Sequence, residues 1–421
     1  MLELTSAHAA TLGVAGLAIA GIIVRPWQLP EATWAVLGAA TLAAFSLISP
    51  SGALLAIRKG TDVYLFLVGM MVLAEFARHE GLFDWLAAYA VRRSRGSAQR
   101  LFVLVYGVGT FVTVFLSNDA TAVVLTPAVY AAAKEAKARP LPYLLTCAFI
   151  ANAASFVLPI SNPANLVVFG AQMPSLGSWL SQFGIASIAS ILVTFGVLRF
   201  TQRSALTGPI ENTVALPLLG IGGRLVAGGI ALTAILLLVA SSLDWQLGLP
   251  TFLAGMATAI VILLLERAPP WPVIREISWS VLPLVAGLFV LVEAVEGTGV
   301  LAPLGRSLAT HAADAPEWTA LVAGGITGAV CNLVNNLPLG LIAGTLTSNS
   351  HLPAWVTGAM LIGVDLGPNL SVTGSLANIL WLVALRREGQ EISAWRFLVL
   401  GVVVMPPALL AALLSFIASR G

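Results

Sequence analysis

The sequence predicts an all-α polytopic membrane protein. We expect two inverted repeats, each of five transmembrane helices plus one re-entrant hairpin, with helices broken at the membrane midplane. Three observations predict this fold: the composition, a series of long apolar runs, and an internal similarity at a fixed offset. Of the 421 residues, 58% are hydrophobic and 10% are charged, whereas a soluble domain has about 25% charged residues. A soluble enzyme is excluded because it would expose far too much apolar surface.

The apolar runs have the length of membrane spans, since a span needs about 20 mostly apolar residues. Two further blocks, 101–133 and 318–346, are interrupted near the middle by polar residues. We interpret each as a hairpin that enters and leaves on one side, although two full spans per block would give the same sidedness. The predicted spans are 8–24, 30–49, 62–78, 141–172, 179–199, 224–241, 249–266, 280–296, 353–383 and 394–418.

The basic residues predict the orientation. No basic residue precedes the first span, so 8–24 does not have the positive start of a signal peptide. We therefore expect a retained span with the N-terminus outside. On this topology 17 Lys and Arg residues fall inside and four outside, which is a strong positive-inside bias. The amphipathic stretches 82–91 and 301–309 are predicted to lie along the inner and outer interfaces, respectively.

The two halves of the sequence resemble each other at an offset of 218 residues. Nine identities occur over positions 67–118, and they include Glu75 with Glu293 and Asn118 with Asn336. These polar pairs are the stronger indication, because Glu and Asn are rare inside spans. After a loop that is shorter in the second half, the offset becomes 213.

Five spans are an odd number, so the second half enters the membrane upside down. The sequence thus divides into a first repeat (1–200), a linker (201–222) and a second repeat (223–421). Inverted repeats with broken helices are typical of secondary transporters.

Four polar breaks interrupt the apolar runs, and each has the pattern of a helix start, with Asn or Ser as N-cap and in places Pro close behind. Helix N-termini inside a membrane suit a polar or anionic ligand, and unpaired backbone at that depth requires a wet cavity or protein around it. We therefore expect one shared cavity; the alternative is that these side chains only join helices. The candidate substrate-binding residues are Ser117, Asn118, Asp119, Thr121, Ser161, Asn162, Asn165, Asn332, Asn335, Asn336, Asn369, Thr373, Ser375 and Asn378.

Apart from Glu31, Asp62, Glu266 and Glu296 at the edges of predicted spans, four of the 19 acidic residues fall inside predicted spans or breaks, where carboxylates are costly and usually functional. Asp119 and Asp365 lie in breaks and are the candidate proton-coupling residues. Alternatively, the Asp119 carboxylate only stabilises the N-terminus of its helix, and Asp365 has a structural role beside the Gly367-Pro368 break. Glu75 and Glu293 lie toward span ends, where we expect them to cap a helix or to pair with an Arg.

Other chemistries find no support in the sequence. The four histidines lack ligand spacing, so no metal site is expected, and no cofactor motif is present. Cys147 and Cys331 are interpreted as small core residues. Without a Walker A lysine, transport must be driven by a gradient or by a separate ATPase partner.

The breaks and their flanks carry a family resemblance. The motifs are Asn118-Asp119, Leu125-Thr126-Pro127, Ser161-Asn162 with Asn165, Asn335-Asn336-Leu337-Pro338, and Gly363-Val364-Asp365-Leu366-Gly367-Pro368 with Gly374-Ser375-Leu376-Ala377. In these motifs, and in order over nearly the whole chain, the sequence resembles the arsenite efflux permeases (arsenical pump membrane proteins) of the ion transporter superfamily.

The resemblance implies export of arsenite and antimonite, as As(OH)3 and Sb(OH)3, across a bacterial inner membrane by alternating access. It also implies a soluble arsenical ATPase as partner of some members. Two positions depart from the family: Val364 replaces a Cys that some members carry, and Asn152 replaces an Asp. The departures remove a thiol and a carboxylate, which places more weight on Asp119 and Asp365.

The expected mechanism is proton-coupled antiport of a small neutral triol held by Asn, Ser and Thr side chains. The main alternative is a sodium-coupled carboxylate (dicarboxylate) carrier of the same superfamily, in which Ser117-Asn118 and Ser161-Asn162 help to build a sodium site. A channel and an intramembrane enzyme are further alternatives. No nucleophile–base pair supports the enzyme.

Overall fold

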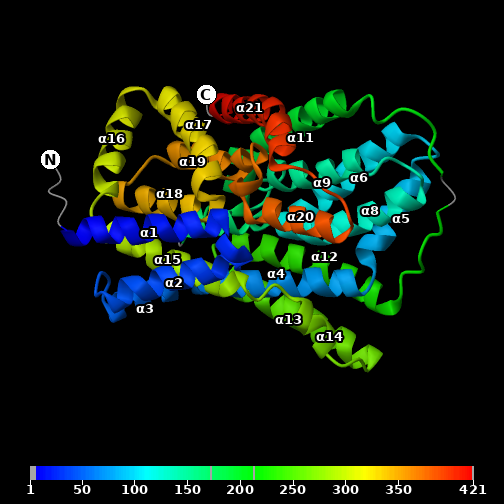
Figure 1. The fold of residues 1–421 in the computed structure, drawn as a ribbon, viewed down its shortest axis with the longest axis horizontal. Coiled ribbons are helices and arrows are strands. Elements are labelled where there is room, and N and C mark those ends of the chain that lie inside the picture. Colours follow the sequence, from blue (N-terminus) through cyan, green and yellow to red (C-terminus); the bar gives the residue numbers. More distant parts are fainter. Residues whose placement is uncertain (1–5, 171–172, 212–213, 420–421) are drawn as a thin grey trace.

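The computed structural model describes residues 6–170, 173–211 and 214–419, and these are helical apart from loops and one isolated bridge between Ser97 and Pro209 (Figure 1). A few residues of the predicted repeats and linker lie outside these ranges, among them the first five residues and Arg420. The helices of the first half are α1 (Ser6–Val24), α2 (Glu31–Ala44), α3 (Pro50–Lys59), α4 (Thr61–His79), α5 (Leu82–Arg93), α6 (Ala98–Phe115), α7 (Asn118–Ala120), α8 (Thr126–Glu135), α9 (Leu141–Ala153), α10 (Pro163–Phe169) and α11 (Leu176–Gln202).

The second half has the same series of helices. A π-helical turn, Thr121–Leu125, joins α7 to α8 in the first half, whereas α18 is continuous at the corresponding place. The second series is α12 (Ile221–Ser242), α13 (Gly248–Glu266), α14 (Trp271–Glu276), α15 (Val281–Gly297), α16 (Leu301–Asp314), α17 (Pro316–Val334), α18 (Asn336–Ser350), α19 (Ala354–Leu366), α20 (Leu376–Arg387) and α21 (Ala394–Ala418).

The order of helices supports the two predicted repeats. The first residues of α6 and α17 are 218 positions apart, and those of α9 and α19, and of α10 and α20, are 213 positions apart. These are the two offsets found in the sequence. The amphipathic helices α5 and α16 lie at opposite ends of the long axis (Figure 1), as expected if one half is upside down. The division into inverted repeats stays a prediction.

The chain is a multi-pass membrane protein. Seven described helices are apolar and long enough to cross a bilayer: α1, α6, α11, α12, α13, α17 and α21. Two bent pairs, α3–α4 at 48° and α15–α16 at 79°, raise the number to nine. The predicted spans 141–172 and 353–383 are not continuous helices. Each is divided at its polar break into two short helices, α9 with α10 and α19 with α20.

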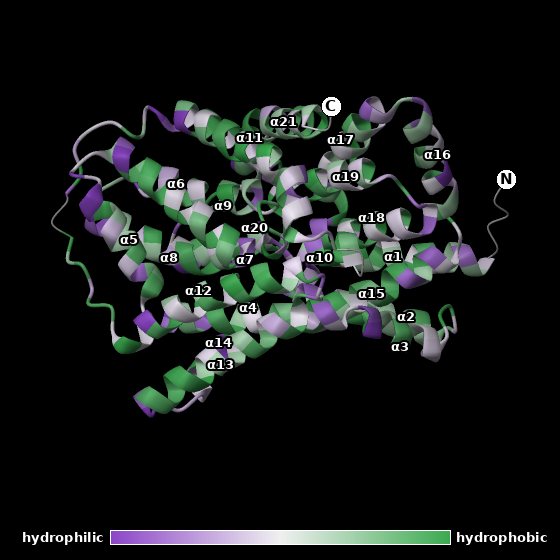
Figure 2. Cartoon of the chain, turned by 180° about the vertical axis from the view of Figure 1, so that it is seen from behind, coloured by the Kyte–Doolittle hydropathy of each residue, from purple (hydrophilic) through white to green (hydrophobic). Residues whose placement is uncertain are grey.

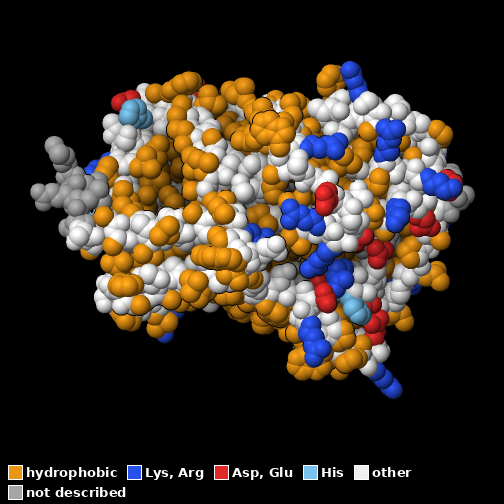
Figure 3. Space-filling model, in the orientation of Figure 1, with side chains coloured by type: hydrophobic (Ala, Val, Ile, Leu, Met, Phe, Trp, Pro, Cys, Tyr) orange, Lys and Arg blue, Asp and Glu red, His pale blue; other side chains and the backbone are white. Residues whose placement is uncertain are grey.

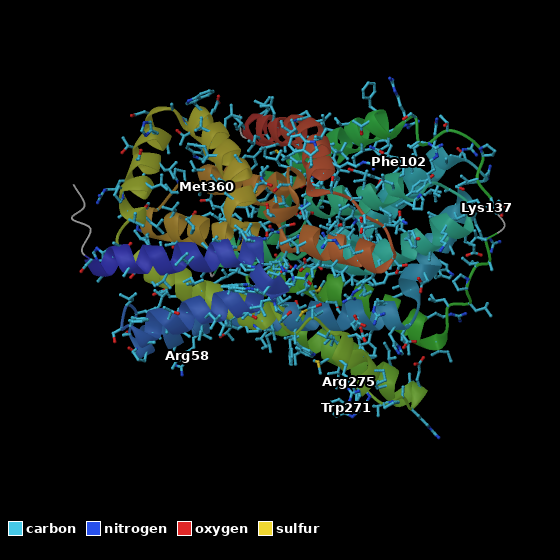
Figure 4. All side chains as sticks on the ribbon, in the orientation of Figure 1. Arg58, Phe102, Lys137, Trp271, Arg275 and Met360 are labelled. Atoms are coloured by element: carbon cyan, nitrogen blue, oxygen red, sulfur yellow. The ribbon has the colours of Figure 1, made fainter. Side chains whose placement is uncertain are left out.

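The polar loops that we predicted to lie inside gather at the end that carries α5. There the linker meets two other loops: Ile210 N donates to Gly96 O at 3.0 Å, and Glu211 N donates to Ala136 O at 2.9 Å. On the face shown in Figure 3, Lys and Arg side chains concentrate on this half, and Figure 2 shows its hydrophilic colouring. Lys137 lies at this end and Arg58 toward the other (Figure 4). The loops around Gly96, Ala136 and Ile210 therefore lie together at one end, as predicted (Figure 4).

Helices of the two halves pack against each other at their interface. Helix α2 of the first half packs against α15 of the second, and α4 packs against α13. Close approach requires glycine here. A Cβ atom on Gly69 would lie 2.4 Å from Thr251 O, and one on Gly287 would lie 2.8 Å from Ala35 O. Gly69 and Gly287 are one of the identical pairs at offset 218, so a glycine at the equivalent position allows close helix packing at both crossings.

Adding a methyl group at this crossing should destabilise the protein. We expect Gly69→Ala to lower the free energy of unfolding by about 1–3 kcal/mol, because the backbone of Thr251 must move. The matched control is Gly107→Ala, since a Cβ there meets no atom within 4 Å; Ala is also the better helix former. Thermal unfolding in detergent measures both, and equal midpoints would contradict the predicted close crossing.

Candidate functional site

Each of the four breaks starts a short helix whose N-cap side chain accepts a backbone N–H. Ser117 Oγ accepts from Ala120 N at 3.2 Å, and Asn162 Oδ1 accepts from Ala164 N at 3.0 Å. In the second half, Asn335 Oδ1 accepts from Leu337 N at 3.4 Å and Ser375 Oγ from Asn378 N at 3.2 Å. The predicted helix starts are confirmed. A helix leaves about four N–H groups without intrahelical partners, so the caps satisfy part of each terminus.

The first break keeps its polar side chains close to its own helix. Asn118 Oδ1 accepts from Asp119 N at 2.9 Å. Thr121 Oγ1 lies 2.8 Å from Thr113 Oγ1 of α6, and both threonines are fully buried. The carboxylate of Asp119 is half-buried and forms no hydrogen bond or ion pair with another described residue, which leaves it available to a cavity.

The fourth break belongs to a buried amide network. Asn152 of α9 donates from Nδ2 to Asn369 Oδ1 at 3.0 Å and to Asn378 Oδ1 at 2.9 Å, and Ser375 Oγ donates to Asn152 Oδ1 at 3.3 Å. All four side chains have no exposed surface. Their hydrogen bonds therefore join α9 to the η5 turn (Gly367–Asn369) and to α20.

The second break is linked to Asp365. Asn162 Nδ2 donates to Asp365 Oδ1 at 2.7 Å. Asn165, one turn into α10, donates from Nδ2 to the backbone oxygens of Ser155 at 2.9 Å and Leu158 at 3.2 Å. Ser161 Oγ donates to Val114 O at 3.0 Å and so ties this break to α6.

The third break is tied to the fourth. Asn332 Nδ2 donates to Gly367 O at 3.1 Å, and Asn332 Oδ1 accepts from Ser371 Oγ at 2.7 Å. Thr373 Oγ1 donates to Asn332 O at 3.0 Å, and Asn335 Nδ2 donates to Thr373 O at 3.3 Å. Asn335 holds a positive φ of 72° at the start of α18, a conformation that Asn tolerates better than most residues.

A cavity of about 690 Å³ opens at the α5 end and reaches the first two breaks. Its lining comes from α4, α5, α7, α8, α10, α14, α15 and α20. Helices α4, α8 and α20 each pass from apolar residues deep in the cavity to charged residues at or near its mouth. Ser117, Asp119 and Pro163 lie where α7 and α10 begin, at the deep end. Asp119 is thus the carboxylate that this cavity offers to a bound molecule deep in the membrane.

The mouth of this cavity carries paired charges. Glu75 accepts two hydrogen bonds from the Arg78 guanidinium, and Glu276 Oε2 lies 4.0 Å from Arg78 Nη2. Burial raises the pKa of Asp84 on α5, and Arg78 opposes that rise. Arg275, Arg387 and Glu388 complete the rim. The expected Arg partner of Glu75 is confirmed.

A second cavity, of about 450 Å³, lies among α3, α4, α10, α15 and α18, with Gln246 from the loop before α13. Lys59 Nζ donates to Glu293 Oε2 at 2.6 Å and Asn349 Nδ2 donates to Glu296 Oε1 at 2.7 Å. Glu293 therefore pairs with a Lys rather than an Arg. Within the described residues, its lining includes α10 from Leu166 onward but none of the N-caps. The conformation is therefore open toward the breaks from the α5 end.

The structure sorts the predicted site residues into two groups. Of the first break, Ser117 and Asp119 line the large cavity, whereas Asn118 and Thr121 are buried outside its lining. Most residues of the other three breaks form hydrogen bonds with protein groups in the interior. Among the described residues neither of these two cavities reaches all four breaks, so the expected shared cavity is not seen in this conformation. Asn332, Asn335, Asn369, Ser375 and Asn378 already have protein partners. Asn336 is buried as well. Sequence reasoning expected an Arg partner for Glu75 but did not place this pair at the mouth of a cavity; the spacing of Glu75 and Arg78, one helical turn apart, was the available signal for the pair.

Comparison with solved structures supports this architecture. The chain is similar to the YdaH transporter of Alcanivorax borkumensis, whose crystal structure has an unusual topology, with a TM-score of 0.54. The similarity covers 87% of this chain and 86% of that one, at 18% sequence identity. At this identity the comparison shows the shared fold alone.

Apolar spanning helices, broken helices capped inside the membrane and an open cavity define a membrane transporter rather than an enzyme. The family profile described as citrate transporter (CitMHS) matches residues 19–364, and the chain belongs to this family. It is 28% identical over 367 residues to the arsenical pump membrane protein of Escherichia coli, covering 82% of this chain and 83% of that one. It is also 28% identical over 382 residues to an uncharacterized transporter of Synechocystis, with the same coverage.

The two cavities should be reachable from opposite sides of the membrane. We expect Ala131→Cys in the large cavity and Ser348→Cys in the second to react with a membrane-impermeant maleimide from opposite sides. The native cysteines, Cys147 and Cys331, are buried and provide the background control. Labelling of right-side-out and inverted vesicles measures the sidedness, and labelling of both positions from one side would contradict the assignment.

Proposed function

We propose that the protein is a secondary active transporter that exports arsenite and antimonite by proton-coupled antiport. The observation that carries the proposal is Asp119, a half-buried carboxylate beside Ser117 at the deep end of the open cavity. No Lys or Arg lies beside it in that part of the cavity lining; the basic residues belong to the rim, where Arg78 is paired with Glu75. A neutral substrate suits such a site, because an anion would meet an uncompensated carboxylate.

The chemistry of As(OH)3 agrees with the deep lining. It is a small neutral triol at neutral pH, and the Ser117 hydroxyl, the Asp119 carboxyl group and free N–H groups at the helix starts can hydrogen-bond it without burying a charge pair. A neutral molecule does not respond to the membrane potential, so a co-moving charge must couple its export. One proton moving inward releases about 2.3 kcal/mol per 100 mV. At 1.36 kcal/mol per factor of ten, this supports a roughly 50-fold concentration gradient.

In the proposed cycle the α5 end faces the cytoplasm of a bacterium, with the N-terminus on the outer side of the inner membrane. The proposal is supported by the concentration of basic loops at that end, since Lys and Arg favour the cytoplasmic side. The cavity would close at this end and the second cavity would deepen at the other, as α6–α8 and α17–α18 move as re-entrant hairpins. Asp119 would release a proton inward as arsenite enters. A soluble arsenical ATPase is a further candidate partner.

The family description favours a second candidate, a carboxylate carrier coupled to sodium. Its binding site would need cations near the half-helix tips to hold a multiply charged substrate. The deep lining offers Asp119 instead, which favours the metalloid. A carboxylate could still bind if Na⁺ accompanied it.

Transport by purified protein decides between the two. In sodium-free proteoliposomes with an imposed pH gradient and no ATP, we expect arsenite to accumulate against its gradient and the accumulation to collapse with a protonophore. Citrate or a dicarboxylate should not accumulate. Flux of a carboxylate that requires sodium, without arsenite flux, would contradict the proposed substrate.

The role of Asp119 has its own test. Asp119→Asn should reduce pH-driven arsenite accumulation to the level of protein-free liposomes, while downhill exchange of arsenite is retained, because the amide cannot carry a proton. Glu317→Gln, an exposed carboxylate at the start of α17, is the matched control and should keep pH-driven accumulation. Unaltered pH-driven accumulation in Asp119→Asn would rule out this residue as the carrier.

A further inference from the structure

Two buried acceptor oxygens lack a hydrogen-bond partner in the polar core. They are Oδ2 of Asp365 on α19 and Oδ1 of Asn165 on α10. Both side chains have no exposed surface. An acceptor left unpaired in a dry interior is unfavourable, and two of them in one network require an explanation.

The repeat supplies a template for this region. Asn378 Nδ2 donates to the backbone oxygens of Pro368 at 2.7 Å and Ser371 at 3.0 Å. Asn165 Nδ2 donates in the same way to the backbone oxygens of Ser155 and Leu158. Every member of the first set lies 213 residues after its counterpart. Asn165 and Asn378 are thus held in equivalent orientations.

The same offset relates their partners. Ser375 Oγ donates to Asn152 Oδ1, and 213 residues earlier Asn162 Nδ2 donates to Asp365 Oδ1. The second substituent of Asn152 is an NH2 group, which donates to Asn378 Oδ1 at 2.9 Å. The equivalent atoms in the other set are Asp365 Oδ2 and Asn165 Oδ1, which are the two unpaired acceptors.

We propose that Asp365 is a neutral carboxylic acid that holds its proton on Oδ2 and donates it to Asn165 Oδ1. The proton would supply the donor that Asn152 has in its NH2 group and that a carboxylate lacks. Asp365 would then clamp α19 to the start of α10 through Asn162 and Asn165, as Asn152 joins α9 to α20. It is a positioning residue in this assignment, and the mobile coupling proton is left to Asp119.

The surroundings of Asp365 favour the neutral form. The titratable group that faces it is the buried thiol of Cys331 on α17. The Ser155 hydroxyl is also close enough to interact with the Asp365 carboxyl group, but its single proton is donated to Asn152 O at 2.8 Å and so does not satisfy Oδ2. The described helices packed against α19 carry other titratable side chains only near their ends or facing elsewhere: Tyr143, Cys147, Arg199, Glu317 and Arg396. Within the described parts of the chain, Asp365 forms no ion pair with a Lys, Arg or His. An ionised carboxylate would be buried without a counter-charge, which is costly.

Infrared spectroscopy of the full-length protein in detergent tests the protonation state directly. At neutral pH we expect a C=O stretch band of a protonated carboxyl group that shifts in D2O. This band should be lost in Asp365→Asn and kept in Asp119→Asn, the matched control. Absence of any protonated-carboxyl band that depends on Asp365 would overturn the proposal. Because this measurement involves no transport, it can fail while the proposed function stands, and the reverse also holds.

Stability provides a second readout that does not depend on resolving one band. Asp365→Asn should unfold at nearly the wild-type temperature, since Asn can accept from Asn162 and donate to Asn165 as the proposed acid does. Asp365→Leu, of similar size but without hydrogen bonds, should unfold at a clearly lower temperature. Because an unfolded Asp ionises at about pH 4, wild-type stability should fall as pH rises from there through the pKa of folded Asp365. Asp365→Asn should remove the part of that fall due to this group. An unfolding temperature of Asp365→Asn as low as that of Asp365→Leu would contradict the clamp.

Discussion

The structure depends on the unsatisfied backbone at four helix ends inside the membrane. Hydrocarbon offers no partner for these groups, so each must bond to protein or face a wet cavity. The N-cap side chains of Ser117, Asn162, Asn335 and Ser375 accept some of these N–H groups. At three of the four breaks, polar side chains also form hydrogen bonds that join helices distant in the sequence. The polar residues therefore serve the fold first, and those left over are available for a substrate.

The two halves differ in side-chain chemistry at a few positions that are equivalent in the internal similarity. Hydrogen bonds at a constant offset of 213 residues show how closely the second and fourth breaks correspond. Where one half has Asn152, the other has Asp365, and this exchange of an amide for an acid changes a donor into an acceptor. At the tips of α7 and α18, the first break has Asp119 where the third has Leu337. A chargeable group thus faces the open cavity on one side only.

The sequence was a good guide wherever the bilayer itself imposes the rule. Span length, basic loops and N-cap residues are local features that the membrane constrains strongly, and the helices begin at the breaks as predicted. The sequence was a poor guide to which partner each polar side chain binds in the structure. Asn378 and Asn369 were interpreted as substrate ligands because polar residues are rare in spans, but in the structure they bond to Asn152, which the composition of its own helix did not mark as a partner.

By itself the sequence determined that the chain crosses the membrane many times and where its helices break, and it predicted two inverted repeats from the similarity of its halves, because these follow from local hydrophobicity, capping and register. The tertiary structure decided which break meets the cavity, which carboxylate is sealed and which is reachable, and that α2 and α4 pack across the halves. Those outcomes depend on contacts between residues some 200 positions apart, such as Asn162 with Asp365. Such pairs leave no mark in either local segment, since each residue alone suits several partners.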